Sequence, residues 1–390
     1  MESKRRWGVL AAGVAGMTAG CAFLYGLPYL LPRFRADGLS LTQAATLVAC
    51  PTFGLLATLV GWGALADRYG ERLVIAAGLG SAGLVLVLAT AARGPVALGA
   101  CLVVAGAAAG SVNAASGRLI LGWFGVAERG LAMGIRQTAQ PLGVAVAAVA
   151  LPGLGAHRRG PALLFLAVSC LATAVLIAVI VRDPPRTTAG AAAVARGNPY
   201  RTSVLFRLHG AGALLVYPQF VVATFGLVFL VDTRGWTEST AGRVLAIAAF
   251  GGAGARLAAG WWSDRAGSRV GPMRTLALTT GAVLAGLALA AGSGGSVPGL
   301  AVGALLVAAV LSVSTNGLSF TAVAEQAGPS WAGRALGIHN TGQNAVAAAA
   351  APIAGAVISA VGYPAAFGSA AALALVAVAV VPRSVRPEPA

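Results

Sequence analysis

Residues 61–72 read GWGALADRYGER, and residues 258–269 read AAGWWSDRAGSR. The two stretches share five residues at a constant separation of 197 positions: Gly63 and Gly260, Asp67 and Asp264, Arg68 and Arg265, Gly70 and Gly267, and Arg72 and Arg269. Aspartate is scarce in this chain, and each copy follows a long apolar run, so chance explains the recurrence poorly. We therefore interpret the chain as an internal duplication.

The residue types in this pattern suit a tight turn between two membrane helices. The first glycine of each copy lets a neighbouring backbone approach, and the second can adopt the positive φ of a short reversal. The arginines stay at the water boundary, where they meet lipid phosphates, carboxylates or helix-end carbonyls. The aspartate can face the positive N-terminus of an adjoining helix.

The spacing Gly-x3-Asp-Arg-x-Gly-x-Arg resembles the signature loop of the major facilitator superfamily, and it occurs in both halves. This resemblance implies two six-helix bundles around a central cavity. It also implies that the ten motif residues act in gating, as cytoplasmic latches that break and reform during alternating access. The motif carries almost no information about the substrate.

The composition places the chain in lipid. Of its 390 residues, 58% are hydrophobic and 10% charged, and the mean hydropathy is +0.83, far above that of a soluble domain. The formal charge of +16 comes from basic residues between apolar runs, which indicates topology signals and no nucleic-acid partner. Four cysteines lie unpaired in apolar segments, so neither a disulfide framework, a metal site nor a cofactor is predicted.

Twelve spans follow when each is given about 20 apolar residues. They lie near residues 8–31, 42–65, 73–92, 96–124, 131–155, 161–181, 204–231, 240–262, 274–291, 298–322, 335–359 and 363–382. The fold class is therefore all-α and integral to the membrane. Residues 1–181 form an N-terminal six-helix bundle, the polar segment 182–203 a cytoplasmic linker, and residues 204–390 a C-terminal six-helix bundle.

The duplication extends beyond the two loops. GLSLTQAATLVA at 38–49 aligns with GWTESTAGRVLA at 235–246, again 197 positions apart. GIRQTAQ at 134–140 aligns with GIHNTGQ at 337–343, and Asn113 aligns with Asn316, both 203 positions apart. These matches predict halves that repeat in parallel. Basic residues are denser in the loops on the side of the N-terminus, which predicts a multi-pass protein of the cell membrane with both termini in the cytoplasm.

Two polar rows are predicted at membrane depth, one in each half. They consist of Arg136, Gln137 and Gln140 in the fifth predicted span and His339, Asn340, Gln343 and Asn344 in the eleventh. Because an α-helix rises about 1.5 Å per residue, the positions of Gln140 and Gln343 in their spans place them close to the midplane of the membrane. Single amides often serve only as interhelical hydrogen bonds, but four polar residues on one helical face favour the lining of a watery cavity. Asn113 and Asn316 either line it or hold helices together.

Three arginines have different interpretations. Arg118 ends the fourth span, where a gating salt bridge to Asp67 or Glu128 is favoured over substrate contact. Arg136 and Arg256 lie deeper and have no acid nearby in sequence, so each binds either an anionic substrate or an unseen structural partner.

Further candidates for the cavity come from the first and seventh spans, and His339 of the eleventh has a second possible role. His339 can change its charge near neutral pH, so proton coupling and simple packing both stay open. Tyr25, Tyr217 and Gln219 are candidates for the opposite wall of the cavity. All eleven acidic residues fall in predicted loops, helix ends or tails, which argues against a proton-driven exporter of cationic drugs.

These observations favour a monomeric secondary transporter of a small organic solute, with an anion preferred and protons as the coupling ion. The nearest alternative is a multidrug exporter with a loose hydrophobic cavity. A transporter-like sensor without flux and a membrane-embedded enzyme are further alternatives, and no catalytic constellation at membrane depth supports the last.

Overall fold

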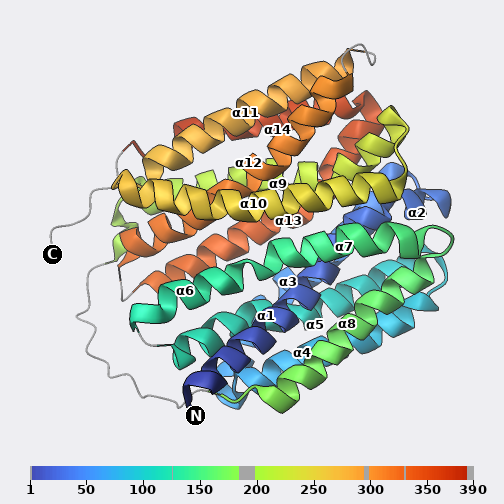
Figure 1. The fold of residues 1–390 in the computed structure, drawn as a ribbon. Helices are drawn as coiled ribbons and strands as arrows, with labels where there is room; N and C mark the ends of the chain where they lie inside the picture. Colours follow the sequence, from blue (N-terminus) through green and yellow to red (C-terminus); the bar gives the residue numbers. More distant parts are fainter. Residues whose placement is uncertain (1, 125, 184–197, 294–297, 329–330, 384–390) are drawn as a thin grey trace. The chain divides into compact units, whose positions relative to one another are not determined.

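A computed structural model describes residues 2–124, 126–183, 198–293, 298–328 and 331–383 (Figure 1). Every regular element within these residues is helical. In the first half they are α1 (Glu2–Gly26), η1 (Leu27–Leu30), α2 (Leu31–Ala36), α3 (Leu41–Tyr69), α4 (Glu71–Thr90), α5 (Gly94–Trp123), α6 (Val126–Gln137), α7 (Ala139–Gly155) and α8 (Arg159–Ile180). After η2 (Pro199–Arg201) follow α9 (Ser203–Arg234), α10 (Glu238–Arg265), α11 (Val270–Gly292), α12 (Pro298–Ala327), α13 (Ala332–Val361) and α14 (Tyr363–Val380).

Twelve segments of the described chain are long and apolar enough to cross a membrane, which confirms the predicted number. The first span joins α1, η1 and α2, and the fifth falls mainly on α7. The sequence predicted one helix over 131–155, but two helices meet there at Thr138. Pro141 explains the break, because it has no N–H to donate to the Gln137 carbonyl and its ring crowds that carbonyl. The corresponding residue of α13 is Asn344, and α13 continues without interruption.

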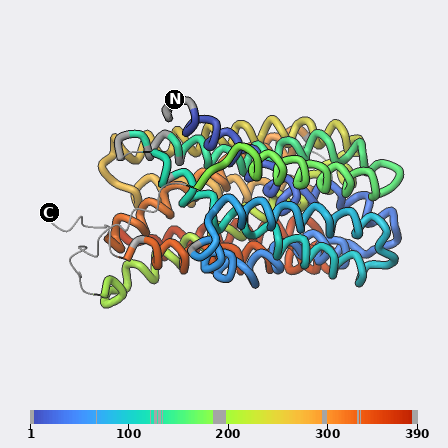
Figure 2. Tube along the Cα trace, turned by 90° about the horizontal axis from the view of Figure 1, so that it is seen from below, coloured from blue at the N-terminus to red at the C-terminus, as the bar shows by residue number. Residues whose placement is uncertain are grey.

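The helices form two compact units, which we call unit 1 (residues 1–187 and 238–246) and unit 2 (residues 188–237 and 247–390). In unit 1, α4 packs against α5 and α8, and α1 packs against α7. In unit 2, α11 packs against α12 and α14, and α9 packs against α13. For these helices the two units repeat the same neighbours, and within each unit the helices run side by side (Figure 2).

The units differ from the predicted halves at one segment. Residues 238–246, the first turns of α10, group with unit 1, although the sequence assigned them to the second bundle. A side chain at Gly242 would meet the Ala148 carbonyl of α7. Of the predicted linker 182–203, residues 184–197 lie outside the described chain.

Unit 1 contains a close approach between two helix backbones. A Cβ added at Gly54 of α3 would lie 2.6 Å from the amide nitrogen of Ala107 on α5 and would also meet the Val103 carbonyl oxygen. A Cβ at Gly106 of α5 would likewise meet the backbone of Pro51. Small residues allow such approach and the dispersion contacts that hold membrane helices together.

Candidate functional site

The signature loop of unit 1 connects α3 to α4 and is tied to the end of α8. Gly70 has a φ of +90°, as the sequence predicted for this position. The Arg72 backbone N–H donates to Asp183 Oδ1 at 2.7 Å, and its guanidinium Nε donates to the Ala178 carbonyl at 3.0 Å. The positive φ favours glycine at this position, and a Cβ there would also displace the Asp183 carboxylate. Residue 72 thus caps the carbonyl end of α8.

Other charged residues near this loop are Arg118, Glu128 and Arg68. Arg118 on α5 lies 3.5 Å from the Glu71 carboxylate, measured from Nε to Oε1. Glu71 was not among the partners predicted for Arg118. Glu128, one of the two predicted partners, binds Arg6 in a bidentate pair at 2.5 and 2.9 Å. The Asp67 side chain, the other predicted partner, lies outside what the structure describes. Arg68 stacks over the Tyr69 ring at 5.3 Å.

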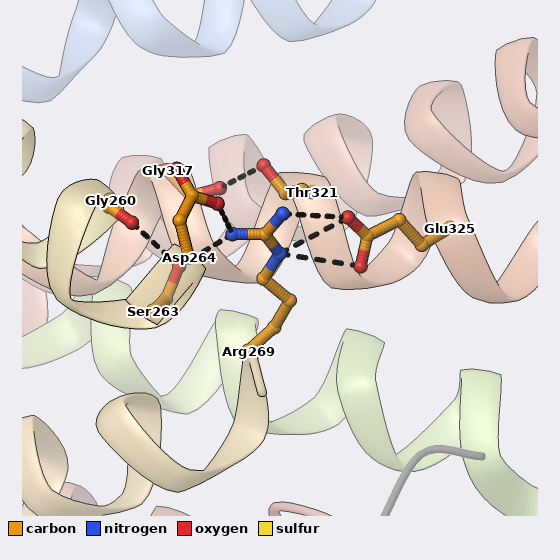
Figure 3. Close-up of polar contacts among 7 residues, drawn as sticks. All are labelled: Gly260, Ser263, Asp264, Arg269, Gly317, Thr321 and Glu325. Atoms are coloured by element: carbon orange, nitrogen blue, oxygen red, sulfur yellow. Dashed lines mark hydrogen bonds and ion pairs between the residues drawn. The ribbon is translucent and has the colours of Figure 1, made fainter. Parts of the chain in front are cut away.

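The signature loop of unit 2 is centred on Arg269 (Figure 3). Its Nη2 lies 3.0 Å from Glu325 Oε1 on α12, its Nη1 donates to Ser263 Oγ at 2.6 Å, and Nη1 also pairs with Asp264. The hydrogen bonds that Arg269 donates, first to Glu325 and then to Asp264, raise the pKa of Arg269 above its ordinary value. The guanidinium therefore stays charged at every physiological pH.

The remaining loop residues are consistent with a turn. Gly267 has a φ of +57°, as predicted. Arg265 lies over the Trp261 ring at 3.8 Å, within the range of a cation–π interaction. Gly63 and Gly260 are half-buried, and a Cβ at either would meet open space in the described chain, so the close approach predicted for them is not found within a unit.

In unit 1 the cation of Arg136 is buried inside the bundle. Arg136 on α6 is 9% exposed, and its Nε and Nη2 both donate to Ser116 Oγ on α5, at 3.0 and 2.9 Å. Its Nη1 donates to the Gln137 side-chain oxygen at 3.4 Å. Ser116 in turn contacts Met17 Sδ on α1 at 3.7 Å. All partners of Arg136 in the described chain are neutral, so its positive charge has no carboxylate beside it.

Unit 2 places histidine at the corresponding position. His339 on α13 is 1% exposed, and its Nε2 lies 3.2 Å from Ser319 Oγ on α12 and 3.3 Å from Gln343 Nε2. Its Nδ1 lies 3.2 Å from Nδ1 of His209 on α9. His209 Nε2 continues to the Tyr200 hydroxyl at 3.0 Å.

Sequence reasoning missed His209 and Tyr200. His209 lies only a few residues inside the seventh span, and Tyr200 lies in the segment assigned to the linker. The available signal was the i, i+9 spacing of two polar aromatic residues around the start of that span. This spacing does not predict a contact with His339, because that contact depends on the positions of α12 and α13.

The amides of α6, α7 and α13 are not equally buried. Gln137 is exposed and Gln140 half-buried. Gln343 is buried and its Nε2 lies 3.5 Å from the Gly212 carbonyl of α9, at the limit of a hydrogen bond. Asn340 and Asn344 are half-buried, and Asn344 Nδ2 donates to the Asn340 backbone carbonyl at 2.9 Å and to its side-chain oxygen at 3.1 Å.

Several predicted binding residues make contacts inside unit 2. Asn316 Nδ2 donates to Gln219 Oε1 at 2.9 Å and so joins α12 to α9. The buried Tyr217 hydroxyl lies 3.3 Å from Ser369 Oγ on α14. Arg256 Nε donates to the Val313 carbonyl at 3.1 Å. For Asn316 and Arg256 these contacts favour the structural alternative that the sequence left open.

The two remaining candidates lie in unit 1. Tyr25 on α1 is half-buried. Asn113 is the counterpart of Asn316, yet its Nδ2 is buried without a hydrogen-bond partner among the described residues. The described residues also contain no cluster of three His, Cys, Asp or Glu side chains that could hold a metal ion.

Comparisons with known proteins agree on the family. The family model of the Major Facilitator Superfamily matches residues 9–352. An uncharacterized transporter of the same type from Mycobacterium tuberculosis (strain ATCC 25618 / H37Rv) is 40% identical over 380 residues, which cover 97% of this chain and 85% of the relative.

Solved structures share the fold at low sequence identity. A D-xylose–proton symporter has a TM-score of 0.77 at 15% identity, with 98% of each chain covered. A bacterial homologue of the human lysosomal transporter Spinster, in an inward-facing and occupied conformation, has a TM-score of 0.75 at 15% identity, covering 97% of this chain and 94% of that one.

Proposed function

The chain belongs to the major facilitator superfamily, and from that premise we propose that it is a proton-coupled secondary transporter of a small organic anion in the cell membrane. The transporter works by alternating access, with both termini in the cytoplasm. The two signature loops act as latches on the cytoplasmic side. In unit 1 the substrate contacts Arg136 and the half-buried amide of Gln140 on α7.

The buried guanidinium of Arg136 carries this proposal. Taking a cation out of water is costly unless a charge or a set of hydrogen bonds compensates it. The described partners of Arg136 are a serine hydroxyl and an amide oxygen, which supply hydrogen bonds without charge. A planar guanidinium in that state is suited to a carboxylate or phosphate, whose two oxygens match its fork.

The test is uptake into proteoliposomes. Purified protein is reconstituted, a pH gradient is imposed, and a panel of radiolabelled mono- and dicarboxylates is offered. We expect at least one carboxylate to accumulate, and the Arg136→Met variant to lose that accumulation. Arg136→Lys should restore it only partly, because an ammonium keeps the charge but loses the bidentate geometry.

A matched control is Arg93→Ala, which removes an exposed arginine from the same unit at the N-terminus of α5. It should transport like the unaltered protein. Anion accumulation that is equal in Arg136→Met and Arg93→Ala would overturn the anion proposal. Efflux of hydrophobic cations that survives Arg136→Met would instead favour a multidrug exporter.

A further inference from the structure

We infer that His209 and His339 form one proton-binding site inside unit 2 and that it takes up a single proton. Its role in carrying the coupling proton rests on the transport function proposed above. Its ability to bind one proton does not, because that follows from the arrangement of the two rings.

Four hydrogen-bond contacts connect the site from the edge of the unit to its interior. The Tyr200 hydroxyl contacts His209 Nε2 at 3.0 Å, and the two Nδ1 atoms are 3.2 Å apart. His339 Nε2 then contacts Ser319 Oγ at 3.2 Å and Gln343 Nε2 at 3.3 Å. The Tyr200 and His209 rings are stacked, and Phe320 packs edge-on against His339, so both imidazoles are held in place.

The chain of contacts can be satisfied in two opposite directions. In one, the Tyr200 hydroxyl donates to His209 Nε2, His209 Nδ1–H donates to His339 Nδ1, and His339 Nε2–H donates to Ser319 Oγ. In the other, the Gln343 amide N–H donates to His339 Nε2, His339 Nδ1–H donates to His209 Nδ1, and His209 Nε2–H donates to Tyr200. Each ring is neutral in both, because a neutral imidazole has one donor and one acceptor nitrogen.

An added proton makes the two rings one site. When His209 Nε2 takes up a proton from water and the Tyr200 hydroxyl turns to accept, His209 becomes an imidazolium. Its Nδ1–H can then pass to His339 Nδ1, which leaves His209 neutral and makes His339 the imidazolium, with Nε2–H still donating to Ser319 Oγ. The proton returns to water by the same two steps in reverse.

The pair has room for one extra proton and no more. With one imidazolium, the single hydrogen between the two Nδ1 atoms is shared. With two, both Nδ1 atoms would carry hydrogens that face each other, and two like charges would lie 5.4 Å apart, measured between ring centroids.

No described carboxylate contacts either ring to offset a second charge. On the elements around the pair, Glu325 of α12 binds Arg269, and Asp232 of α9 is bonded by Tyr363 of α14. Of the cations on these elements, Arg207 of α9 donates to the Val380 carbonyl and Arg334 of α13 lies over the Trp331 ring.

Burial increases along the chain of contacts. Tyr200 precedes the membrane span that begins at Ser203, His209 is half-buried, and His339 is nearly inaccessible. Water therefore reaches the Tyr200 end directly, and the inner ring exchanges its proton through the outer one. Gly212 leaves space for the inner ring, because a Cβ there would lie 3.0 Å from His339 Nε2 and closer still to Cε1.

Nuclear magnetic resonance of the full-length protein in lipid nanodiscs tests the inference without a substrate. The chain contains three histidines, so labelling their ring nitrogens with 15N gives three sets of signals, and His157→Gln assigns the exposed one. Between about pH 4 and 9, which brackets the ordinary histidine pKa, we expect the signals of His209 and His339 to move together. Their summed shifts should correspond to one proton.

Variants separate the pair from the two rings taken singly. His209→Gln should leave His339 without the shared step, whereas His157→Gln should leave that step intact. Tyr200→Phe keeps the ring stack and removes one hydroxyl, so it should change the tautomer of His209 and retain the uptake of one proton. Should His209 itself be needed for folding, this milder variant still reads out the contact.

Independent titration of the two rings, uptake of two protons, or no titration at all would overturn the inference. The proposed transport is tested separately. A protein that takes up one proton on the pair but accumulates no solute would refute the transport proposal alone. Accumulation with two independent rings would refute the histidine site alone.

Discussion

Positions 136 and 339 occupy the same place in the two copies of the duplication, and so do Ser116 and Ser319. In unit 1 the serine binds a guanidinium at 2.9–3.0 Å, and in unit 2 it binds an imidazole at 3.2 Å. The duplication has kept the helix positions and the hydroxyl while the basic group changed. Unit 1 therefore holds a permanent charge where unit 2 holds a titratable one.

The signature loops differ in a related way. In unit 1 the neighbouring helix α5 supplies the cation, Arg118, and the loop supplies Glu71. In unit 2 the loop supplies Arg269 and the neighbouring helix α12 supplies Glu325. Thr321 stands at the position of Arg118, and among the described residues its hydroxyl donates to the Gly317 carbonyl of its own helix (Figure 3). Both units thus have an ion pair between the loop and a neighbouring helix, but the residue on the loop is acidic in unit 1 and basic in unit 2.

The largest expected effect comes from making the two buried sites alike. His339→Arg places a permanent cation beside His209, in a site where no described carboxylate contacts either ring. We expect a loss of about 3–5 kcal/mol in the free energy of unfolding, the range for an uncompensated buried charge. The measurement is unfolding of the purified protein in a denaturing detergent titration.

His339→Gln is the matched control, because it is neutral, and it should cost clearly less. If His339→Arg is as stable as the unaltered protein, unit 2 accepts a fixed charge as unit 1 does. The contrast between the two units would then be one of residue identity alone.

A second comparison concerns the close approach of α3 and α5. Gly54→Ala forces the methyl group into backbone atoms of Val103 and Ala107, so we expect destabilisation of about 1–3 kcal/mol from overpacking. A Cβ added at the corresponding Gly251 would lie 3.1 Å from the Val310 side-chain Cγ2 and would meet no backbone atom as closely, so Gly251→Ala should cost less. Thermal unfolding of both variants checks this, and equal midpoints would show that the units are packed alike at this contact.

The paired asparagines give a smaller effect. Asn316→Ala leaves the buried Gln219 oxygen without its donor, which should cost about 1–3 kcal/mol. Asn113→Ala removes an amide whose buried Nδ2 has no described partner, so its cost should fall near zero or below. Unfolding of the two single variants in detergent measures both losses, and the loss for Asn316→Ala should be the larger. A larger loss for Asn113→Ala would reveal that unit 1 has a partner for this group.

Much of the fold follows from the sequence because its signals are local or periodic. Recurrence of the Asp-Arg loop predicted the duplication, and apolar run length predicted twelve spans. The break at Thr138 also had a local signal in Pro141, which the span prediction overlooked. Contacts between helices were less predictable. The pairing of Arg269 with Glu325, and of His209 with His339, joins residues far apart in the chain and depends on how each helix is rotated, which hydrophobicity alone does not specify.

The smallest effect is expected at the signature loops, where the pairs are partly exposed. Arg269 and Glu325 are 26% and 51% exposed, so solvent screens their attraction, and Arg269 keeps Asp264 when Glu325 is neutralised. Glu325→Gln should change the free energy of unfolding by less than about 1 kcal/mol, and high salt should reduce even that difference.

The same change at Glu71 is the counterpart in unit 1. If these pairs act as latches, both variants should alter the transport rate and the labelling of cysteines placed beside the loops while stability stays nearly constant. A large loss of stability with an unchanged rate would instead assign the pairs to the fold, and the exchange of signs between the units would then have no bearing on transport.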